Sequence, residues 1–184
     1  MSDEILIRHC APTLASIKTG SLFTSRFETE EAMRGSLRML NQRLRGKGVY
    51  AIPLRFRGGV GLIYLYRPHR LEKDLQRQEV VRLLADLGYA EGTPAAQLRD
   101  LAQRLRSTDA FPHEIGLFLS YPPEDVAGFI RAPGEAKYTG IWKVYGDVAA
   151  AQRTFARYRR CTSRLMHRWQ QGSSIEQLAA GVRA

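Results

Sequence analysis

Apolar residues recur at helical spacing in several separate stretches of the chain. An amphipathic helix is predicted over 30–45, where large apolar residues follow one another at steps of four, three and four. A longer helix of about six turns is predicted over 147–171, with Asp147 as its N-cap. Other helical stretches are expected at 12–18, at 68–106 with a break at Gly88, after Pro112, after Pro122 and at 174–180.

Two stretches change to the shorter period of a β-strand. The segment VYAIPLRFRGGVGLIYLYRP predicts a hairpin over 49–66, because Gly58-Gly59 supplies the positive φ of a tight turn. Pro53 indicates that the first strand of this hairpin lies at a sheet edge or carries a bulge. The segment YTGIWKVYGD predicts a strand over 139–145.

These elements together predict the fold class and the organisation of the chain. We expect an α+β protein with a small mixed or antiparallel sheet, made of the hairpin and the strand over 139–145, surrounded by six to eight helices. A chain of 184 residues suits a single domain over 1–184, with the long C-terminal helix packed on its core.

Composition narrows the class of protein. Hydrophobic residues make up 44% and charged residues 25% of the chain, which is typical of a globular protein. We expect a cytoplasmic protein with no membrane contact, because no apolar run approaches the length of a membrane span and MSDEILIRH lacks the features of a signal peptide. The two cysteines, Cys10 and Cys161, are then expected as free thiols.

The charge balance favours an anionic partner. Lys and Arg number 28 against 18 Asp and Glu, which gives a net charge of +10, although coding bias alone can also enrich arginine. The predicted last helix concentrates this charge in a stripe opposite its apolar side, at Arg153, Arg157, Arg160, Arg164 and Arg168. Such a stripe is either a solvated face or a surface for an acidic protein; nucleic acid is a further alternative that no motif supports.

His9 and Cys10 stand side by side just before Pro12. If Pro12 begins a helix, Cys10 lies at its amino end, where the helix dipole lowers the pKa of a thiol. Adjacent residues rarely point the same way, so a direct pair of His9 and Cys10 is not expected. The alternative is that Cys10 is a small apolar residue of the core.

A second group of candidate residues lies further along the chain. His113 and Glu114 fall in the first turn of the helix predicted after Pro112, where the dipole keeps an imidazole neutral and able to act as base or ligand. In the alternative, His113 packs on a neighbouring aromatic ring and Glu114 caps the helix. Lys143 shares one side of its strand with Tyr145, and it either extends from an edge or points into a pocket.

Three functional hypotheses follow. The first is an accessory or binding protein that docks an acidic partner and takes a small anionic ligand, a metal or a haem-like cofactor in a pocket. The second is a thiol enzyme with Cys10 as nucleophile and His113 as base, and the third is nucleic-acid binding by the arginine stripe. The pocket residues would be His9, Cys10, His113, Glu114, Lys143 and Tyr145, and a metal would draw on His9, Cys10, His113 and Cys161.

Several stretches in order resemble one bacterial family. They are HCAPTLASIKTGSLF, LIYLYRP, FPHEIGLFLSYPPEDVAGFI, WKVYGD and RYRRCT, and they resemble domain of unknown function 3793, which is known mainly from anaerobes. The resemblance implies that His9-Cys10, Pro112-His113-Glu114 and the residues of WKVYGD match the family pattern. It also implies a flavodoxin-like acidic partner, since such proteins are encoded near members of the family. It assigns no activity.

Overall fold

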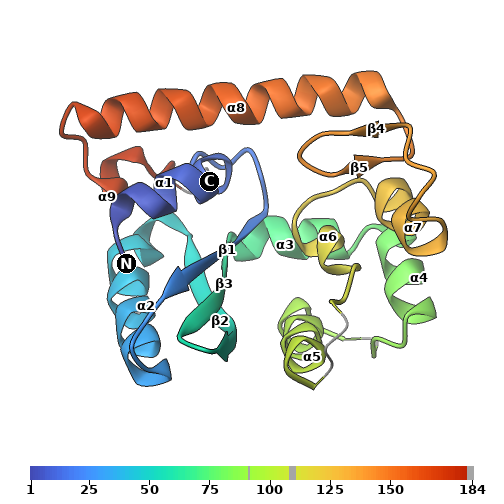
Figure 1. Ribbon diagram of the computed structural model, residues 1–184, viewed down its shortest axis with the longest axis horizontal. Helices are drawn as coiled ribbons and strands as arrows, with labels where there is room; N and C mark the ends of the chain where they lie inside the picture. The colour runs from blue at the N-terminus through green and yellow to red at the C-terminus, as the bar shows by residue number, and fades with distance from the viewer. Residues whose placement is uncertain (91, 108–110, 182–184) are drawn as a thin grey trace. The chain divides into compact units, whose positions relative to one another are not determined.

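The computed structural model describes residues 1–90, 92–107 and 111–181 of the chain (Figure 1). The chain divides into two compact units: unit 1 comprises Met1–Arg70 and Tyr158–Ala184, and unit 2 comprises Leu71–Arg157. Both boundaries of unit 2 fall inside helices, α3 and α8. The expectation of a single domain stays a prediction.

The α+β class is confirmed. The described residues form nine α-helices, one 3-10 helix and five strands, so the helices exceed the expected number by one. The helices are α1 (Asp3–Leu14), α2 (Glu30–Leu44), α3 (Pro68–Leu75), α4 (Gln78–Asp86), α5 (Pro94–Ser107), α6 (Ile115–Phe118), α7 (Pro123–Arg131), α8 (Val148–Gln170) and α9 (Ile175–Leu178), with η1 (Arg45–Lys47) after α2. The strands are β1 (Gly20–Arg26), β2 (Tyr50–Arg57), β3 (Val60–Tyr66), β4 (Tyr138–Thr139) and β5 (Lys143–Val144).

Unit 1 contains a three-stranded antiparallel sheet in the order β1-β3-β2. The hairpin predicted over 49–66 is confirmed, and Gly58 and Gly59 turn it with φ angles of 56° and 76°. Both expectations for Pro53 hold as well, since β2 is an edge strand and its register shifts between Pro53 and Arg55. The strand pattern, with its period of two residues, therefore predicted the central strand and one edge strand of the sheet.

The third strand of this sheet differs from the prediction. It is β1, to which no element was assigned, whereas the segment over 139–145 forms a separate hairpin of β4 and β5 in unit 2. That segment turns at Gly140, where a Cβ atom would lie 2.2 Å from the Phe155 ring. The close approach of the backbone to an aromatic side chain fixes a tight turn in place of one continuous strand.

The core of unit 1 covers one face of the sheet. Phe23, Ile63 and Leu65 point from β1 and β3 toward the apolar sides of α1 and α2 and of the second half of α8. The apolar spacing predicted for 30–45 is confirmed here, because all four of its large apolar residues are buried. The helix α9 completes this core beside α1 (Figure 1).

A buried arginine joins four carbonyl groups in unit 1. The guanidinium of Arg67, directly after β3, donates hydrogen bonds to the carbonyl oxygens of Thr13 (2.7 Å), Leu14 (2.6 Å), Lys47 (2.9 Å) and Ala180 (2.8 Å). Two of these carbonyls end α1, where helical geometry leaves acceptors free and the dipole favours a cation. Arg67 thereby links the end of α1 to η1 and to the segment after α9.

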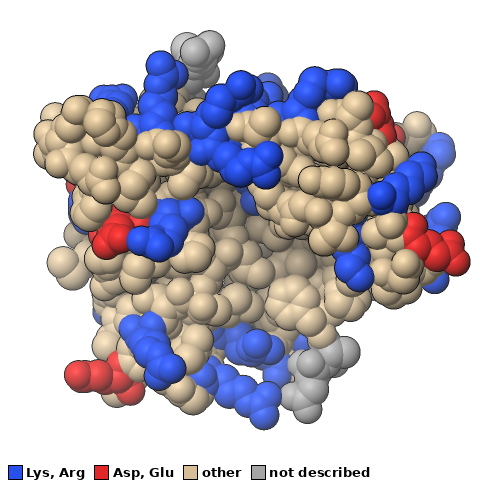
Figure 2. All heavy atoms as spheres, turned by 45° about the horizontal axis from the view of Figure 1, so that its top comes forward, with Lys and Arg blue, Asp and Glu red and all other residues tan. Residues whose placement is uncertain are grey.

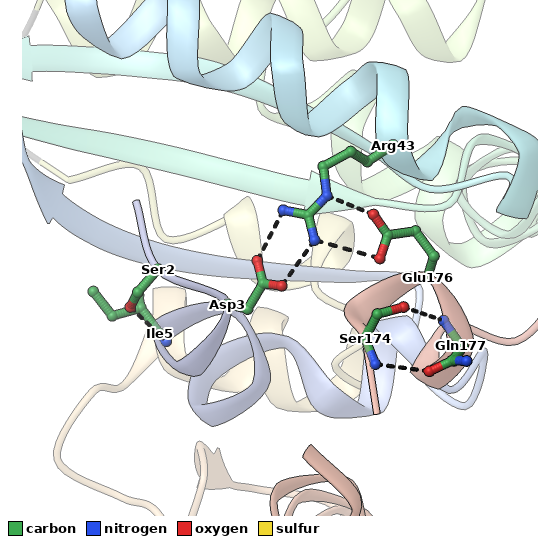
Figure 3. Close-up of polar contacts among 7 residues, drawn as sticks. All are labelled: Ser2, Asp3, Ile5, Arg43, Ser174, Glu176 and Gln177. Carbon is green, nitrogen blue, oxygen red and sulfur yellow. Dashed lines mark hydrogen bonds and ion pairs between the residues drawn. The ribbon is translucent and has the colours of Figure 1, made fainter. Parts of the chain in front are cut away.

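A second arginine links three helices of unit 1 at the surface. The Arg43 guanidinium, from α2, pairs with the carboxylates of Asp3 in α1 (2.8 Å) and Glu176 in α9 (2.5 Å), as Figure 3 shows. Ser2 caps the start of α1 in the same view, and Ser174 and Gln177 form a capping box at α9. The hydrogen bond from Arg43 is the main cause that lowers the pKa of Glu176 to about 2.

Unit 2 is mainly helical, and aromatic side chains fill its centre around the β4–β5 hairpin. The ring of Trp142 stacks on Tyr121 at 4.7 Å and meets Phe155 of α8 edge-on at 4.4 Å. Phe155 in turn stacks on Tyr138 at 6.3 Å. These contacts hold the hairpin against the first half of α8.

We expect Arg67→Lys to lower the free energy of unfolding by about 2 to 4 kcal/mol, because lysine has three donors and no planar fork to reach all four carbonyls. Urea unfolding followed by circular dichroism measures the change. The control is Arg38→Lys at an exposed position of α2, expected to change stability by less than about 0.5 kcal/mol. Equal effects of the two substitutions would contradict the role assigned to Arg67.

Arg43→Met should reduce stability at neutral pH by about 1 kcal/mol, a modest value because the pairs are partly exposed. The folded pKa of Glu176 lies below its ordinary value of 4.5, so this stabilisation is complete above pH 4.5 and is lost as the pH falls toward 2. Urea unfolding of the original protein and of Arg43→Met, at pH values from above 4.5 down toward 2, checks whether their free energies of unfolding become equal at low pH. Arg34→Met, which removes one exposed pair with Glu30, is the control with the smaller effect.

Candidate functional site

The helix that holds Cys10 begins earlier than the sequence analysis predicted. α1 starts at Asp3 with Ser2 as its N-cap, and Pro12 lies in its last turn. The prediction that Pro12 begins the helix is therefore wrong, and Cys10 does not lie at a helix amino end. The apolar spacing of Leu6, Ile7 and Cys10 extends the helix toward the N-terminus, and Ser2-Asp3-Glu4 is a capping signal that could have located its start.

Cys10 is completely buried in the core of unit 1. Burial raises the pKa of its thiol to about 12, although the neighbouring Lys18 and Ser21 partly oppose this. The thiol is therefore neutral at physiological pH, contrary to the expected thiolate. Cys10 behaves as the core residue of the alternative interpretation.

Several polar residues lie around Cys10, and none of them was predicted from the sequence. Lys18 is only 8% exposed, burial lowers its pKa to about 8, and its Nζ lies 5.9 Å from the centre of the Tyr158 ring. The hydroxyl groups of Thr13 and Ser21 share a buried hydrogen bond of 2.9 Å. Lys18 belongs to the loop that joins α1 to β1, and its sequence carries no signal of burial.

The remaining residues predicted around Cys10 do not gather into a metal site. His9 is exposed and stacks on Phe23 at 6.2 Å, so it points away from the buried Cys10, as expected for neighbours in a helix. The Cys161 thiol is half-buried and donates to the Ala11 carbonyl at 3.6 Å. Over residues 1–90, 92–107 and 111–181, no three His, Cys, Asp or Glu side chains are grouped to hold a metal ion.

The predicted partner of Cys10 belongs to the other unit. Cys10 lies in unit 1, whereas His113 and Glu114 precede α6 in unit 2. Glu114 is buried, and its carboxylate accepts a hydrogen bond from the Tyr89 hydroxyl (3.0 Å) and pairs with Arg104 (3.5 Å). Burial and the neighbouring Glu114 raise the pKa of Tyr89. Glu114 therefore has partners within the protein, which does not favour the predicted ligand role.

Three of the predicted site residues do come together in unit 2. The His113 ring meets Phe129 of α7 edge-on at 4.7 Å, and the Lys143 ammonium lies 5.2 Å from the centre of the same ring. Lys143 and Tyr145 both donate hydrogen bonds of 3.0 Å to the Pro133 carbonyl. His113 and Lys143 are exposed, so this group presents two basic side chains on an aromatic base.

Asp125 organises this region, although no role was predicted for it from the sequence. Its buried carboxylate accepts three hydrogen bonds, from the Trp142 indole (2.7 Å) and from the backbone amides of Tyr145 (2.7 Å) and Gly146 (2.8 Å). These bonds attach the end of β5 to α7 and so place Lys143 and Tyr145. The neighbouring acidic residue Glu124 is exposed. The sequence therefore does not show which of the two adjacent carboxylates is buried.

The arginine stripe of α8 is confirmed as an exposed feature. We define the arginine face of α8 as Arg153, Arg157, Arg160, Arg164 and Arg168, all of which are exposed. The 23 residues of α8 include no Asp or Glu, and its opposite side buries apolar residues such as Phe155 and Leu165. Figure 2 shows basic side chains along the region of α8. No helix of the described segments has the length and apolar character needed to cross a bilayer.

Comparison with known proteins identifies a family and no activity. A family model described as protein of unknown function (DUF3793) matches residues 6–179, which is nearly the whole chain. No curated protein and no solved structure matches the chain. The family match agrees with the resemblance carried by the quoted stretches of sequence.

Iodoacetamide at neutral pH should modify Cys161 at least roughly tenfold faster than Cys10, because only the half-buried thiol is accessible to solvent and burial keeps Cys10 neutral. Mass spectrometry of the native protein with time gives both rates. In concentrated urea the two cysteines should react alike, which is the control. Faster alkylation of Cys10 in the native protein would support the thiol-enzyme hypothesis instead.

Proposed function

Because the chain belongs to the DUF3793 family of proteins of unknown function, we propose a function from its own surface: a cytoplasmic accessory protein that docks an acidic protein partner through the arginine face of α8. The proposal rests on the observation that this helix exposes five aligned arginines over about 22 Å and contains no acidic residue. Guanidinium groups pair with carboxylates through two parallel hydrogen bonds, so the face suits a row of Asp and Glu side chains.

The opposite side of α8 supports this proposal. Burial of Ala151, Phe155, Tyr158 and Leu165 uses the apolar side of the helix in packing, so the side that faces solvent is the basic one. The flavodoxin-like partner implied by the family resemblance falls within the proposed class of acidic proteins. Electrostatic attraction over such a face raises the rate of association and makes binding sensitive to salt.

Side-chain composition favours a protein over single-stranded nucleic acid. The exposed positions of α8 carry Arg, Gln, Ala, Ser and His, with no Tyr, Phe or Trp among them. Single-stranded nucleic acids are held largely by stacking of bases on aromatic side chains, which this face lacks. Binding of duplex nucleic acid needs only phosphate contacts, so the experiment below must distinguish a duplex from an acidic protein as the partner.

The proposed pocket for a small anionic ligand, a metal or a haem-like cofactor has less support. Of its predicted residues, Cys10 is buried in the core of unit 1, and Glu114 is paired inside unit 2. His113, Lys143 and Tyr145 keep a candidate role, since they lie together around Phe129 and Pro133. The docking proposal does not depend on this group.

Replacing Arg160, Arg164 and Arg168 by Gln should weaken binding of fluorescent poly-L-glutamate by about tenfold or more, since three exposed pairs at roughly 0.5 kcal/mol each are lost. Fluorescence anisotropy at low salt measures the affinity. The matched control replaces three exposed arginines elsewhere, Arg38, Arg99 and Arg131, and removes the same charge. We expect the control to weaken binding less than threefold.

Two results would overturn the docking proposal. Equal weakening by both triple variants would mean that net charge alone attracts the polymer. Tighter binding of a duplex DNA of about 20 base pairs than of poly-L-glutamate, lost only in the α8 variant, would assign the arginine face to nucleic acid.

A further inference from the structure

β1 is an edge strand whose outer hydrogen-bonding groups have no partner in the parts of the chain that the structure describes. Two backbone hydrogen bonds at the ends of the β1–β3 pair show which residues of β1 bond to β3. The Arg67 amide donates to the Thr19 carbonyl, and the Phe27 amide donates to the Gly59 carbonyl. In an antiparallel pair, every second residue bonds to the neighbouring strand. The odd-numbered residues of β1 therefore bond to β3, and Leu22, Thr24 and Arg26 direct their amides and carbonyls outward.

The other edge of the same sheet is protected, in contrast to β1. The side-chain amide of Asn41 pairs with both backbone groups of Ala51 in β2, at 2.9 and 2.7 Å, as a neighbouring strand would. Pro53 removes one amide from that edge, and the adjacent bulge interrupts its register. These are common ways in which proteins prevent strand addition. β1 has neither a proline nor a bulge over its seven residues.

The outward edge of β1 is open to solvent, and the one charged residue within the strand is basic. Thr24 and Arg26 are exposed and Leu22 is partly exposed, whereas the side chains of Ser21 and Phe23 are buried. Arg26 is the charged residue of the strand, which contains no Asp or Glu, and the exposed Glu28 follows beyond its end. A second copy of the chain would bring another net charge of +10 to this edge, so charge complementarity favours an acidic segment instead.

We infer that β1 accepts an extended acidic segment of a partner protein as a fourth strand of the unit 1 sheet. Backbone hydrogen bonds to Leu22, Thr24 and Arg26 would supply affinity, and a carboxylate beside Arg26 would favour acidic sequences. The acidic nature of the partner rests on the proposed function, whereas the open edge is a separate observation. The arginine face of α8 and the edge of β1 are therefore tested separately.

The test uses the full chain and an eight-residue peptide that alternates glutamate and valine. Hydrogen exchange followed by NMR should show the amides of Leu22, Thr24 and Arg26 slowed by roughly tenfold or more when the peptide is saturating. The same peptide with N-methyl groups on its bonding edge should not bind, which tests the backbone contact without altering the protein. A lysine–valine peptide should bind at least about tenfold more weakly.

Thr24→Pro provides the matching change in the protein. It removes one outward amide and no β1–β3 hydrogen bond, so it should weaken peptide binding by about tenfold, whereas Thr24→Val should leave binding unchanged. Slow exchange of Phe23 and Ser25 in the proline variant shows that the sheet is intact. If the variant does not fold, the N-methylated peptide decides the matter by itself.

The outcomes separate this inference from the proposed function. If poly-L-glutamate still binds the arginine face but the glutamate–valine peptide protects no β1 amide, the strand inference alone is overturned. If the peptide protects β1 while poly-L-glutamate does not bind, the docking proposal alone fails. Protection of β1 that rises with protein concentration in the absence of peptide would identify a second copy as the occupant and overturn the acidic partner.

Discussion

The Arg67 guanidinium lies where the end of α1, η1 and the segment after α9 meet, and it is the donor that four of their carbonyl groups share. Its burial and the nearby Arg70 lower its pKa to about 10, so the charged form carries a real desolvation penalty. The four hydrogen bonds offset that penalty only while all three segments keep their places. The position of the end of α1, from which the chain continues into β1, depends on this contact.

Unit 2 stabilises a buried charge of the opposite sign in a related way. Asp125 accepts two backbone amides and one indole N–H, and no cation pairs with it within the described residues. In each unit, therefore, neutral polar groups surround a buried charged side chain. The directional hydrogen bonds that they form with it hold loops and strand ends in place.

Particular residues show why the sequence predicted some elements and missed others. Gly58-Gly59 and the large apolar residues of α2 are signals that depend on a few neighbours along the chain, and both predictions are confirmed. β1 was missed because its polar residues dilute the alternating pattern. Pro12 was misread because proline is tolerated in a last turn when tertiary packing supports the helix, and local preference does not reveal such support.

By itself, the sequence determined the arginine face, since the spacing of arginines along a continuous helix fixes their common direction whatever lies beneath. The family of the chain also follows from the sequence alone. Only the tertiary structure decided the state of Cys10, the pairing of Glu114 and the grouping of His113 with Lys143. Burial and hydrogen-bond partners come from segments distant in the chain, and they set the pKa and accessibility on which chemistry depends.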